Sequence, residues 1–331
     1  MAVSTPAPVK GGGEGAARVP PAAARSRRQV WRSRLYKLDV NGSPYAYIAP
    51  FFILFFAFGL FPLIYTAYVS LHRVELGTLD KQSYVGLANY TRLLHDQFFW
   101  NALKNTFTLG VLSTVPQLLM ALGLAHLLNY RLRGRTLWRV SVLTPYVTST
   151  AAAAIVFAEL FGRDYGFINW VLSAFGVHHI DWENGRWTSQ IAISAIVTWR
   201  WTGYNALIYL AAMQAIPGEL YGAAAVDGAG RWQLFRHVTM PSIRPAIIFT
   251  VVISTIGATQ LFGEPLLFGG NYGHLGGSSH QYQTLGLYLY DMGWYNFHLG
   301  RAAAIAWTMF LLIALLVLIN TMLARRIRSS S

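Results

Sequence analysis

Six residues in two apolar stretches of the sequence have the side chains of a binding site for a ligand rich in hydroxyl groups. Arg200 lies deep in the fourth apolar stretch, where a charge is costly unless it has a partner or faces a polar cavity. Glu159 or Glu264 could pair with it. Two interpretations stay open: a structural ion pair, or a residue that lines a hydrophilic cavity. The six residues are Arg200, Trp201, Tyr204, Asn205, Thr259 and Gln260.

The types of these residues suit a carbohydrate. Aromatic rings offer an apolar face to the apolar side of a sugar ring. The amides of Asn205 and Gln260 can both donate and accept hydrogen bonds, as sugar hydroxyls do. The competing interpretation is structural, because aromatic residues in a membrane helix also pack against neighbouring helices or form a belt at the bilayer surface.

The motifs of common enzyme classes are absent. The sequence has no G-x-x-x-x-G-K-[ST] phosphate loop, so the chain cannot hydrolyse ATP by that route. It also has no H-E-x-x-H helix, no G-x-S-x-G elbow and no cysteine. His178 and His179 are adjacent, whereas a helical metal site needs ligands four residues apart. We therefore expect a conduit or a transmission element that is not an enzyme and binds no metal or cofactor itself.

The composition is that of a membrane protein with several spans. The 331 residues are 54% hydrophobic and 12% charged, with a mean hydropathy of +0.37, whereas soluble domains carry about 25% charged residues. The formal net charge of +13 does not indicate a nucleic-acid partner, because the Lys and Arg residues flank apolar stretches. They are typical of topology signals and of contacts with anionic membrane lipid.

Six apolar stretches are long enough to cross a bilayer, which needs about 20 residues per helix. We predict an all-α membrane protein with six transmembrane helices in a domain of residues 45–325. Residues 1–44 form a basic N-terminal tail with few apolar residues, predicted to be disordered and cytoplasmic, and residues 326–331 form a short cytoplasmic tail. The predicted spans are about 45–71, 106–128, 140–161, 189–216, 246–268 and 302–323.

Six spans place both termini on the same side of the membrane. Most of the 26 Lys and Arg residues lie in the two tails and in the loops that follow the second and fourth predicted spans. By the positive-inside rule, these segments are cytoplasmic. The loop that follows the fourth span would then be accessible to a cytoplasmic partner.

This loop, Ile216–Pro245, is polar, glycine-rich and basic. Pro217 suits a first helical turn, because its missing N–H would have no partner there. Small and apolar residues follow up to Val226, and Asp227-Gly228 ends the predicted helix. A short helix of small residues buries little of its own surface, so we expect it to seat in a cleft on another protein.

The loop resembles the signature loop in the permease subunits of ABC importers, whose pattern is roughly E-A-A, two residues, D-G-A and a basic, aromatic run that ends in Pro. Gly222 stands where the family has its leading Glu. Either this subunit couples more weakly and a partner permease keeps the full motif, or the change is neutral. The residues assigned to coupling are Glu219, Gly222, Ala223, Ala224, Asp227, Gly228, Ala229, Phe235 and Pro241.

The resemblance implies a mechanism and a set of partners. In this family the loop forms a coupling helix that seats in a groove of an ATPase subunit, and ATP-driven closure of two such subunits tilts the spans. The chain would have the ABC type I importer permease fold and lie in the bacterial cytoplasmic membrane. Its partners would be a second homologous permease, two ATPases that hold ATP and Mg²⁺, and an extracytoplasmic solute-binding protein.

Two further stretches resemble the sugar-transporting members of this family. Val85–Phe107 carries a G-L-x-N-Y and a D-x-x-F-W-x-A-x-x-N-T element and is predicted to form an interfacial helix. Gly269–Gly300, which contains Gln283-Thr284-Leu285, is expected to face outward and meet the solute-binding protein. The resemblance implies import of a di- or oligosaccharide, with the substrate between helices near the midplane.

Three alternatives stay open. Permeases for glycerol-3-phosphate are similar, and Arg200 alone does not separate the two substrates. A secondary transporter driven by an ion gradient predicts inverted repeats or broken helices with intramembrane carboxylates, but the sequence has no clear repeat and few acidic residues. An integral membrane enzyme is disfavoured by the missing catalytic motifs.

Overall fold

The structure of the chain is a computed structural model that describes residues 27–78, 82–130, 133–269 and 275–329. Helices make up nearly all of the regular structure in these ranges, as predicted for an all-α protein. The exception is an antiparallel hairpin of two short strands, β1 (His72–Arg73) and β2 (Ser83–Tyr84), with the 3₁₀ turn η2 (Leu76–Thr78) between them. The chain divides into two units, residues 1–63 and 64–331.

The first unit is helical from Arg27 onward. α1 (Arg27–Leu54) continues through a π-helical stretch, η1 (Phe55–Leu60), into α2 (Phe61–Ser70), which extends into the second unit. Gly42–Ser70 is long and apolar enough to cross a membrane, in agreement with the predicted first span. Residues 27–44 are helical, although we expected a disordered tail; Arg, Gln, Leu and Lys in this segment are good helix formers. Residues 1–26 of that tail lie outside the described residues.

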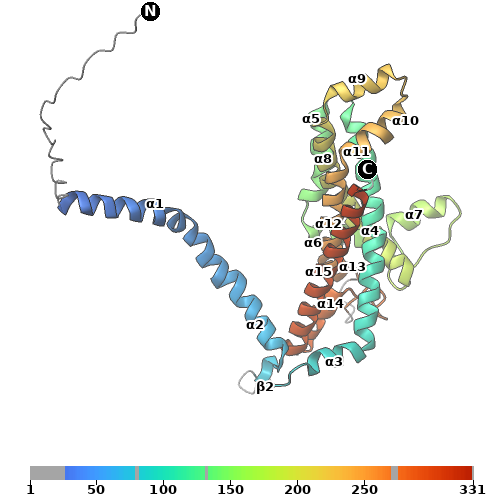
Figure 1. Cartoon of the computed structure of the whole chain (residues 1–331). Helices are drawn as coiled ribbons and strands as arrows, with labels where there is room; N and C mark the ends of the chain where they lie inside the picture. Colours follow the sequence, from blue (N-terminus) through green and yellow to red (C-terminus); the bar gives the residue numbers. More distant parts are fainter. Residues whose placement is uncertain (1–26, 79–81, 131–132, 270–274, 330–331) are drawn as a thin grey trace, which may run out of the picture. The chain divides into compact units, whose positions relative to one another are not determined.

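The second unit is built around the long helices α4 (Gln97–Asn129) and α8 (Arg186–Gln214), which pack along each other (Figure 1). α12 (Arg244–Thr259) packs against α4, and α15 (Leu299–Ser329) packs against α12. Among the described helices, α4 and α15 are also apolar and long enough to span a membrane. Much of the hydrophobic core of the second unit lies between these four helices.

The start of α4 differs from the prediction. α3 (Ala88–His95) is a short separate helix, and Asp96 caps the next helix by accepting a hydrogen bond from the Phe98 N–H at 2.9 Å. The side chain of an N-terminal cap satisfies a backbone donor that has no partner within the helix. The predicted interfacial helix at 85–107 is thus two helices, and its second half belongs to α4.

The third predicted span is bent rather than straight. α5 (Arg135–Val147) and α6 (Thr150–Leu160) meet at an angle of 90°. Thr148 and Ser149 between them are extended, and the Thr148 hydroxyl donates to the Thr144 carbonyl at 3.1 Å. Ser and Thr hydroxyls compete with the backbone for such carbonyls, and this favours a break.

The fourth predicted span forms α8, but this helix is less apolar than the other spans, because it is the central helix of the unit. It buries polar side chains such as Gln190, Thr198 and Asn205 against its neighbours. Gly203 allows α5 to approach closely, since a Cβ at this position would overlap the carbonyl oxygen of Val142.

The fifth predicted span is also interrupted. α12 ends at Thr259, and a separate helix, α13 (Gly263–Phe268), follows. The segment before α12, made of α10 (Arg231–Leu234), η3 (Phe235–Thr239) and α11 (Met240–Ser242), meets it at 65°. The described residues thus contain three helices that could each span a membrane, or up to five spans if each bent pair counts as one.

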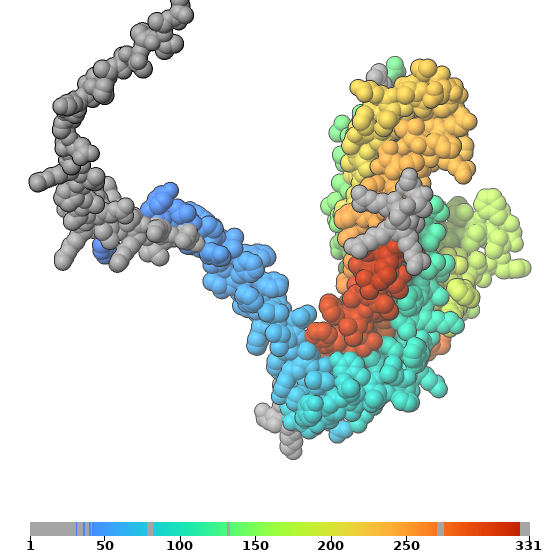
Figure 2. All heavy atoms as spheres, in the orientation of Figure 1, coloured from blue at the N-terminus to red at the C-terminus, as the bar shows by residue number. Residues whose placement is uncertain are grey.

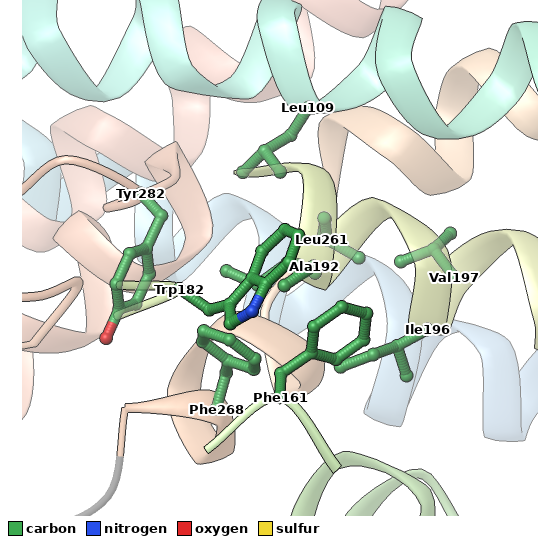
Figure 3. Packing of buried hydrophobic residues seen from close by; sticks show 10 residues of the cluster. Leu109, Phe161, Trp182, Ala192, Ile196, Val197, Leu261, Phe268 and Tyr282 are labelled. Atoms are coloured by element: carbon green, nitrogen blue, oxygen red, sulfur yellow. The ribbon is translucent and has the colours of Figure 1, made fainter. Parts of the chain in front are cut away.

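A cluster of buried aromatic and aliphatic side chains joins the helices to the long loop before α8. Trp182 of that loop packs against Phe161 and against residues of α4, α8 and the α12–α13 region (Figure 3). The described part of the loop after α13 is equally integrated: α14 (Leu285–Tyr290) packs on α4 and α15 and leads into η4 (Asp291–Tyr295). Gln283 and Thr284 are fully buried, so this part of the loop is more than a connector.

Candidate functional site

The loop between α8 and α12 forms a short helix that is open to solvent. α9 (Gly218–Val226) begins directly after Pro217, which was expected inside the first turn, and it ends before Asp227-Gly228, as predicted. None of its residues is buried, and the Val226 side chain is 88% exposed. Figure 2 shows this segment in yellow at one end of the second unit. A helix that buries none of its own residues is suited to contact another surface.

A Schellman motif closes the C-terminus of α9. The Gly228 N–H donates to the Ala225 carbonyl at 3.1 Å, and the Ala229 N–H donates to the Ala224 carbonyl at 3.0 Å. Gly228 has a φ of +79°, which favours glycine. Asp227 is exposed and lies at the negative end of the helix dipole, where a carboxylate is unfavourable by a few tenths of a kcal/mol. Local stability therefore does not explain an acidic residue here.

Gly222 lies on the open side of α9. A Cβ at this position would meet no atom within 4 Å, and the backbone is helical. Glu219 and Ala223 are exposed on the same helix, and Ala224 is half-buried. A side chain longer than that of glycine would therefore extend into free space, so the fold of this chain does not require glycine at residue 222.

Phe235 and Tyr221 anchor the loop to the bundle. The Phe235 ring lies 4.7 Å from the His126 ring in an edge-to-face arrangement and packs in a cluster with residues of α4 and α8. The Tyr221 hydroxyl lies 2.9 Å from the Thr239 hydroxyl. Phe235, which the sequence assigned to coupling, thus attaches the loop within this chain, whereas Pro241 is exposed.

A cavity of about 480 Å³ lies between α4, α8, α12 and α13. Arg200, Trp201 and Gln260 line it, so the structure brings together half of the six residues singled out in the apolar stretches. Polar side chains of α4 and α12 complete the lining. A cavity of this volume and mixed polarity can hold a ligand that combines hydroxyl groups with apolar faces.

Arg200 pairs with Glu264 and not with Glu159. Its Nη1 lies 2.5 Å from the Glu264 Oε1, and both residues are buried. Both also line the cavity, so the two interpretations of Arg200 are compatible. Its buried Nε has no hydrogen-bond partner in the described part of the chain. The pair neutralises the charge while leaving one guanidinium donor unsatisfied.

The other three predicted residues do not line this cavity. Tyr204 stacks on Tyr146 of α5 with the ring centres 4.7 Å apart, and the Asn205 amide donates to the Trp201 carbonyl at 3.3 Å. The Thr259 hydroxyl donates to the Thr255 carbonyl at 2.8 Å. Tyr204 thus packs α8 against α5, in agreement with the structural interpretation, whereas the bonds of Asn205 and Thr259 stay within their own helices.

Comparison with known proteins shows to which family the chain belongs. Residues 117–329, more than half of the chain, match the family described as binding-protein-dependent transport system inner membrane component. The chain belongs to this family. The resemblance seen in the loop sequence is thereby confirmed, and the protein is a membrane component of an ABC transporter.

Several relatives cover almost the whole permease. This chain is 36% identical over 291 residues to the lactose transport system permease protein LacF of Rhizobium radiobacter. The alignment covers 87% of this chain and 95% of the relative. It is 34% identical over 314 residues to the arabinooligosaccharides transport system permease protein AraP of Bacillus subtilis, with coverages of 92% and 95%.

A solved structure shares the fold of the permease. It is a chain of a bacterial ABC transporter involved in the import of the acidic polysaccharide alginate, with a TM-score of 0.75, 24% identity and coverages of 89% and 99%. At this identity the likeness establishes the fold, which is that of an ABC importer permease.

Several polar residues of the permease cavity were not predicted from the sequence. Ser113 and Gln117 lie one turn apart on α4, and the Gln117 amide donates to the Ser254 hydroxyl of α12 at 3.1 Å. Thr150 of α6 also lines the cavity. The signal was available: residues four apart lie on the same face of a helix, so Ser113 and Gln117 mark a polar face in an apolar span.

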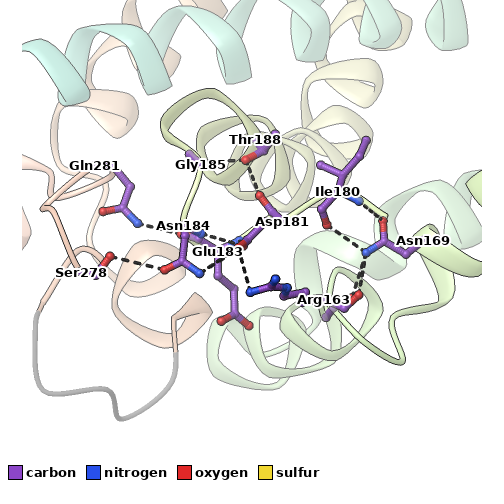
Figure 4. A network of polar contacts seen from close by, with 11 residues as sticks. Arg163, Asn169, Ile180, Asp181, Glu183, Asn184, Gly185, Thr188, Ser278 and Gln281 are labelled. Carbon is purple, nitrogen blue, oxygen red and sulfur yellow. Dashed lines mark hydrogen bonds and ion pairs between the residues drawn. The ribbon is translucent and has the colours of Figure 1, made fainter. Parts of the chain in front are cut away.

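A polar network orders the loop between α6 and α8 of the permease (Figure 4). Asn169 of α7 (Phe167–Ala174) bonds the carbonyl and the N–H of Ile180. Asp181 accepts from the N–H groups of Glu183 and Asn184. Burial alone would raise the pKa of Asp181, but bonds from the Asn184 side chain and these N–H groups outweigh it and lower the pKa. Its carboxylate therefore stabilises the loop at neutral pH and loses this effect as acidification protonates it.

Proposed function

We propose that the chain is the permease subunit of a bacterial ATP-driven importer that translocates a di- or oligosaccharide across the cytoplasmic membrane. The names of LacF and AraP, which refer to lactose and to arabinooligosaccharides, support a sugar. The cavity beside Arg200 supports it independently, since Trp201 offers an aromatic face and Gln260 and Gln117 offer amides. In this proposal the sugar passes through the cavity between α4, α8 and α12.

The observation that carries the coupling part of the proposal is the exposure of α9. The helix buries none of its residues, ends in a fixed Schellman motif and presents Asp227. We infer that α9 seats in a groove on an ATPase subunit, with Asp227 facing a cationic or hydrogen-bond donor group there. The anchor at Phe235 and Tyr221 then transmits movement of α9 to the helices.

The same proposal includes the membrane topology of the chain and the other subunits of the importer. The permease has six spans, both termini and the loop 216–245 lie in the cytoplasm, and a second homologous permease completes the pathway. Two ATPase subunits hold ATP and Mg²⁺, and a solute-binding protein delivers the sugar from the other side. The distribution of Lys and Arg supports this orientation.

Glycerol-3-phosphate is a less suitable substrate. A phosphate ester needs an excess of positive charge in its site, but Glu264 neutralises Arg200 in the cavity. The other polar side chains of the lining, among them Ser113, Gln117 and Gln260, are uncharged. This balance favours a neutral sugar.

Affinity purification of the tagged full chain from its native membrane in mild detergent tests the proposed assembly. Mass spectrometry is expected to identify an ATPase and a second permease in the purified material, and the co-purified binding protein can then be tested with lactose, arabinooligosaccharides and glycerol-3-phosphate. Recovery of the chain alone, with no ATPase in any detergent, would contradict the importer assembly.

A further inference from the structure

A second polar cavity, of about 260 Å³, lies between the β1–β2 hairpin, α3 and the start of α15. Three arginines line it: Arg73 from β1, Arg92 from α3 and Arg301 from the first turn of α15. Arg92 and Arg301 also line a smaller adjoining cavity. This region is at the opposite end of the bundle from α9 (Figure 1). It is separate from the cavity beside Arg200, which shares none of its lining residues.

The backbone around this cavity is held in place. Glu75 and His298 form an isolated β-bridge, and the Gly300 N–H donates to the Val74 carbonyl at 3.2 Å. A Cβ at Gly300 would overlap the His72 carbonyl oxygen, so α15 starts in close contact with the hairpin. The buried Asn89 amide donates to the Ser70 and His72 carbonyls at 2.8 and 3.0 Å. The cavity is therefore built by contacts between three elements.

Among the described residues, the three guanidinium groups have no partner of opposite charge. Within the described part of the chain, none of them has a carboxylate within 4.0 Å or a side-chain hydrogen bond. Two carboxylates are nearby. Glu75 lies 3.8 Å from the His298 Nδ1, and Asp96 accepts from the Tyr288 hydroxyl at 2.7 Å. Three guanidinium groups and two carboxylates leave a net positive charge around the cavity. The N-terminus of α15 adds the partial positive charge of the helix dipole.

The cavity lies at the end of the apolar stretch of two spans. The candidate spans in α4 and α15 start at Gln97 and Leu299, next to Arg92 and Arg301. Exposed aromatic side chains mark the same end: Tyr84 of β2, Trp100 of α4 and Trp294 of η4. Tyr and Trp are enriched at the level of the lipid headgroups. The arginines therefore lie where phospholipid phosphates are concentrated.

We propose that this cavity binds the phosphate of an anionic phospholipid headgroup. The planar guanidinium groups of arginine match phosphate oxygens in pairs, and three of them can surround one phosphodiester. The acyl chains of the lipid lie against the apolar surfaces of α4 and α15. The bound lipid holds the hairpin, α3 and the start of α15 together.

Lipid binding to the purified full chain, together with the subunits that accompany it, tests this proposal. Native mass spectrometry would measure the affinity for phosphatidylglycerol and for phosphatidylcholine, with inorganic phosphate as a competitor. The test variants are the double variant Arg92→Gln with Arg301→Gln, and Arg73→Gln, whose exposed side chain lies outside the helices. The matched control, Lys104→Gln with Arg163→Gln, removes two positive charges that line neither cavity.

The wild-type chain and the control are expected to bind phosphatidylglycerol at least tenfold more tightly than phosphatidylcholine. Both test variants should reduce this preference to threefold or less, with helical content by circular dichroism unchanged in Arg73→Gln. An unchanged preference in the variants would overturn the proposal. Displacement of phosphatidylglycerol by inorganic phosphate at a similar concentration would also overturn it, because the site would then bind the free ion. If the variants kept the lipid preference but lost affinity for the solute-binding protein, the arginines would belong to a contact with that protein.

Discussion

Arg200 and Glu264 compensate each other inside the bundle, where either charge alone would be costly. Replacing both partners of a buried ion pair with neutral residues is often tolerated, whereas removing one costs about 3–5 kcal/mol, because it leaves the other charge without a partner. Both side chains also line the cavity. The pair therefore combines a structural role with a position suited to contact the transported sugar.

Arg200→Met is expected to lower the thermal unfolding temperature of the purified complex strongly. Adding Glu264→Gln should restore most of this loss, since the uncompensated carboxylate is then gone. Because the pair lines the proposed sugar pathway, the double variant should still transport sugar at least tenfold more slowly than the wild type. Tryptophan fluorescence during heating and uptake of labelled sugar by liposomes measure the two effects.

The exposed pair Arg163–Asp181 provides the control for this experiment. Its charged atoms lie 3.4 Å apart and the Arg163 side chain is 63% exposed, so Arg163→Gln should change stability by less than about 1 kcal/mol. Wild-type uptake by the Arg200→Met, Glu264→Gln double variant would show that the ion pair is structural only.

α9 has ends that follow from local chemistry. Pro217 precedes its first turn, and Gly228 provides the left-handed residue of the Schellman motif. A side chain at a left-handed position costs about 1 kcal/mol or more. No residue of α9 is fully buried and could offset such a cost, so the order of its last turn depends on this glycine.

Gly228→Ala is therefore expected to fray the last turn of α9, and its amides should exchange hydrogen about fivefold faster, in line with a loss of about 1 kcal/mol. Gly222→Ala is the matched control. It lies in the same helix with a helical φ and open space around it, and alanine should slow exchange slightly. Hydrogen exchange followed by mass spectrometry compares the two variants. Equal protection in both would argue against the Schellman motif as the element that orders α9.

Elements with strong local signals were predictable from the sequence, and bends inside apolar stretches were not. The ends of α9 follow from Pro217 and Asp227-Gly228, whereas the 90° bend between α5 and α6 lies at Thr148 and Ser149, which the hydropathy of the predicted third span does not set apart from their neighbours. The helix from Arg27 was missed because its basic composition suggested disorder. Likewise, Arg200 was found because a charge in an apolar stretch is conspicuous, whereas neutral Gln117 was not.

At the scale of the second unit, α4 and α8 connect the loop 216–245 to the cavity beside Arg200. α8 contributes Arg200 to the cavity and ends at Gln214, directly before the loop. α4 carries Gln117 in the cavity and His126 against Phe235. Helices of this length can transmit a displacement of α9 to the cavity, so both ends of the mechanism lie on the same two helices.

The absence of cysteine makes the orientation of the chain directly testable. Single cysteines can be introduced as Arg133→Cys, before α5, and His178→Cys, in the loop before α8; both positions are exposed. If the loops rich in Lys and Arg are cytoplasmic, a membrane-impermeant maleimide should label only the cysteine at position 178 in spheroplasts. Labelling at 133 should require permeabilisation. The reverse pattern would invert the proposed topology.

The claim that the permease couples ATP hydrolysis to sugar import is tested most directly by ATPase activity of the complex in liposomes, with and without sugar-loaded binding protein. Asp227→Arg places a cation where we propose that a carboxylate meets the ATPase, and it should abolish stimulation by the binding protein while leaving membrane insertion intact. Gly222→Glu, in the open space of the same helix, should keep or increase stimulation. Unchanged stimulation in Asp227→Arg would contradict the coupling role of this loop.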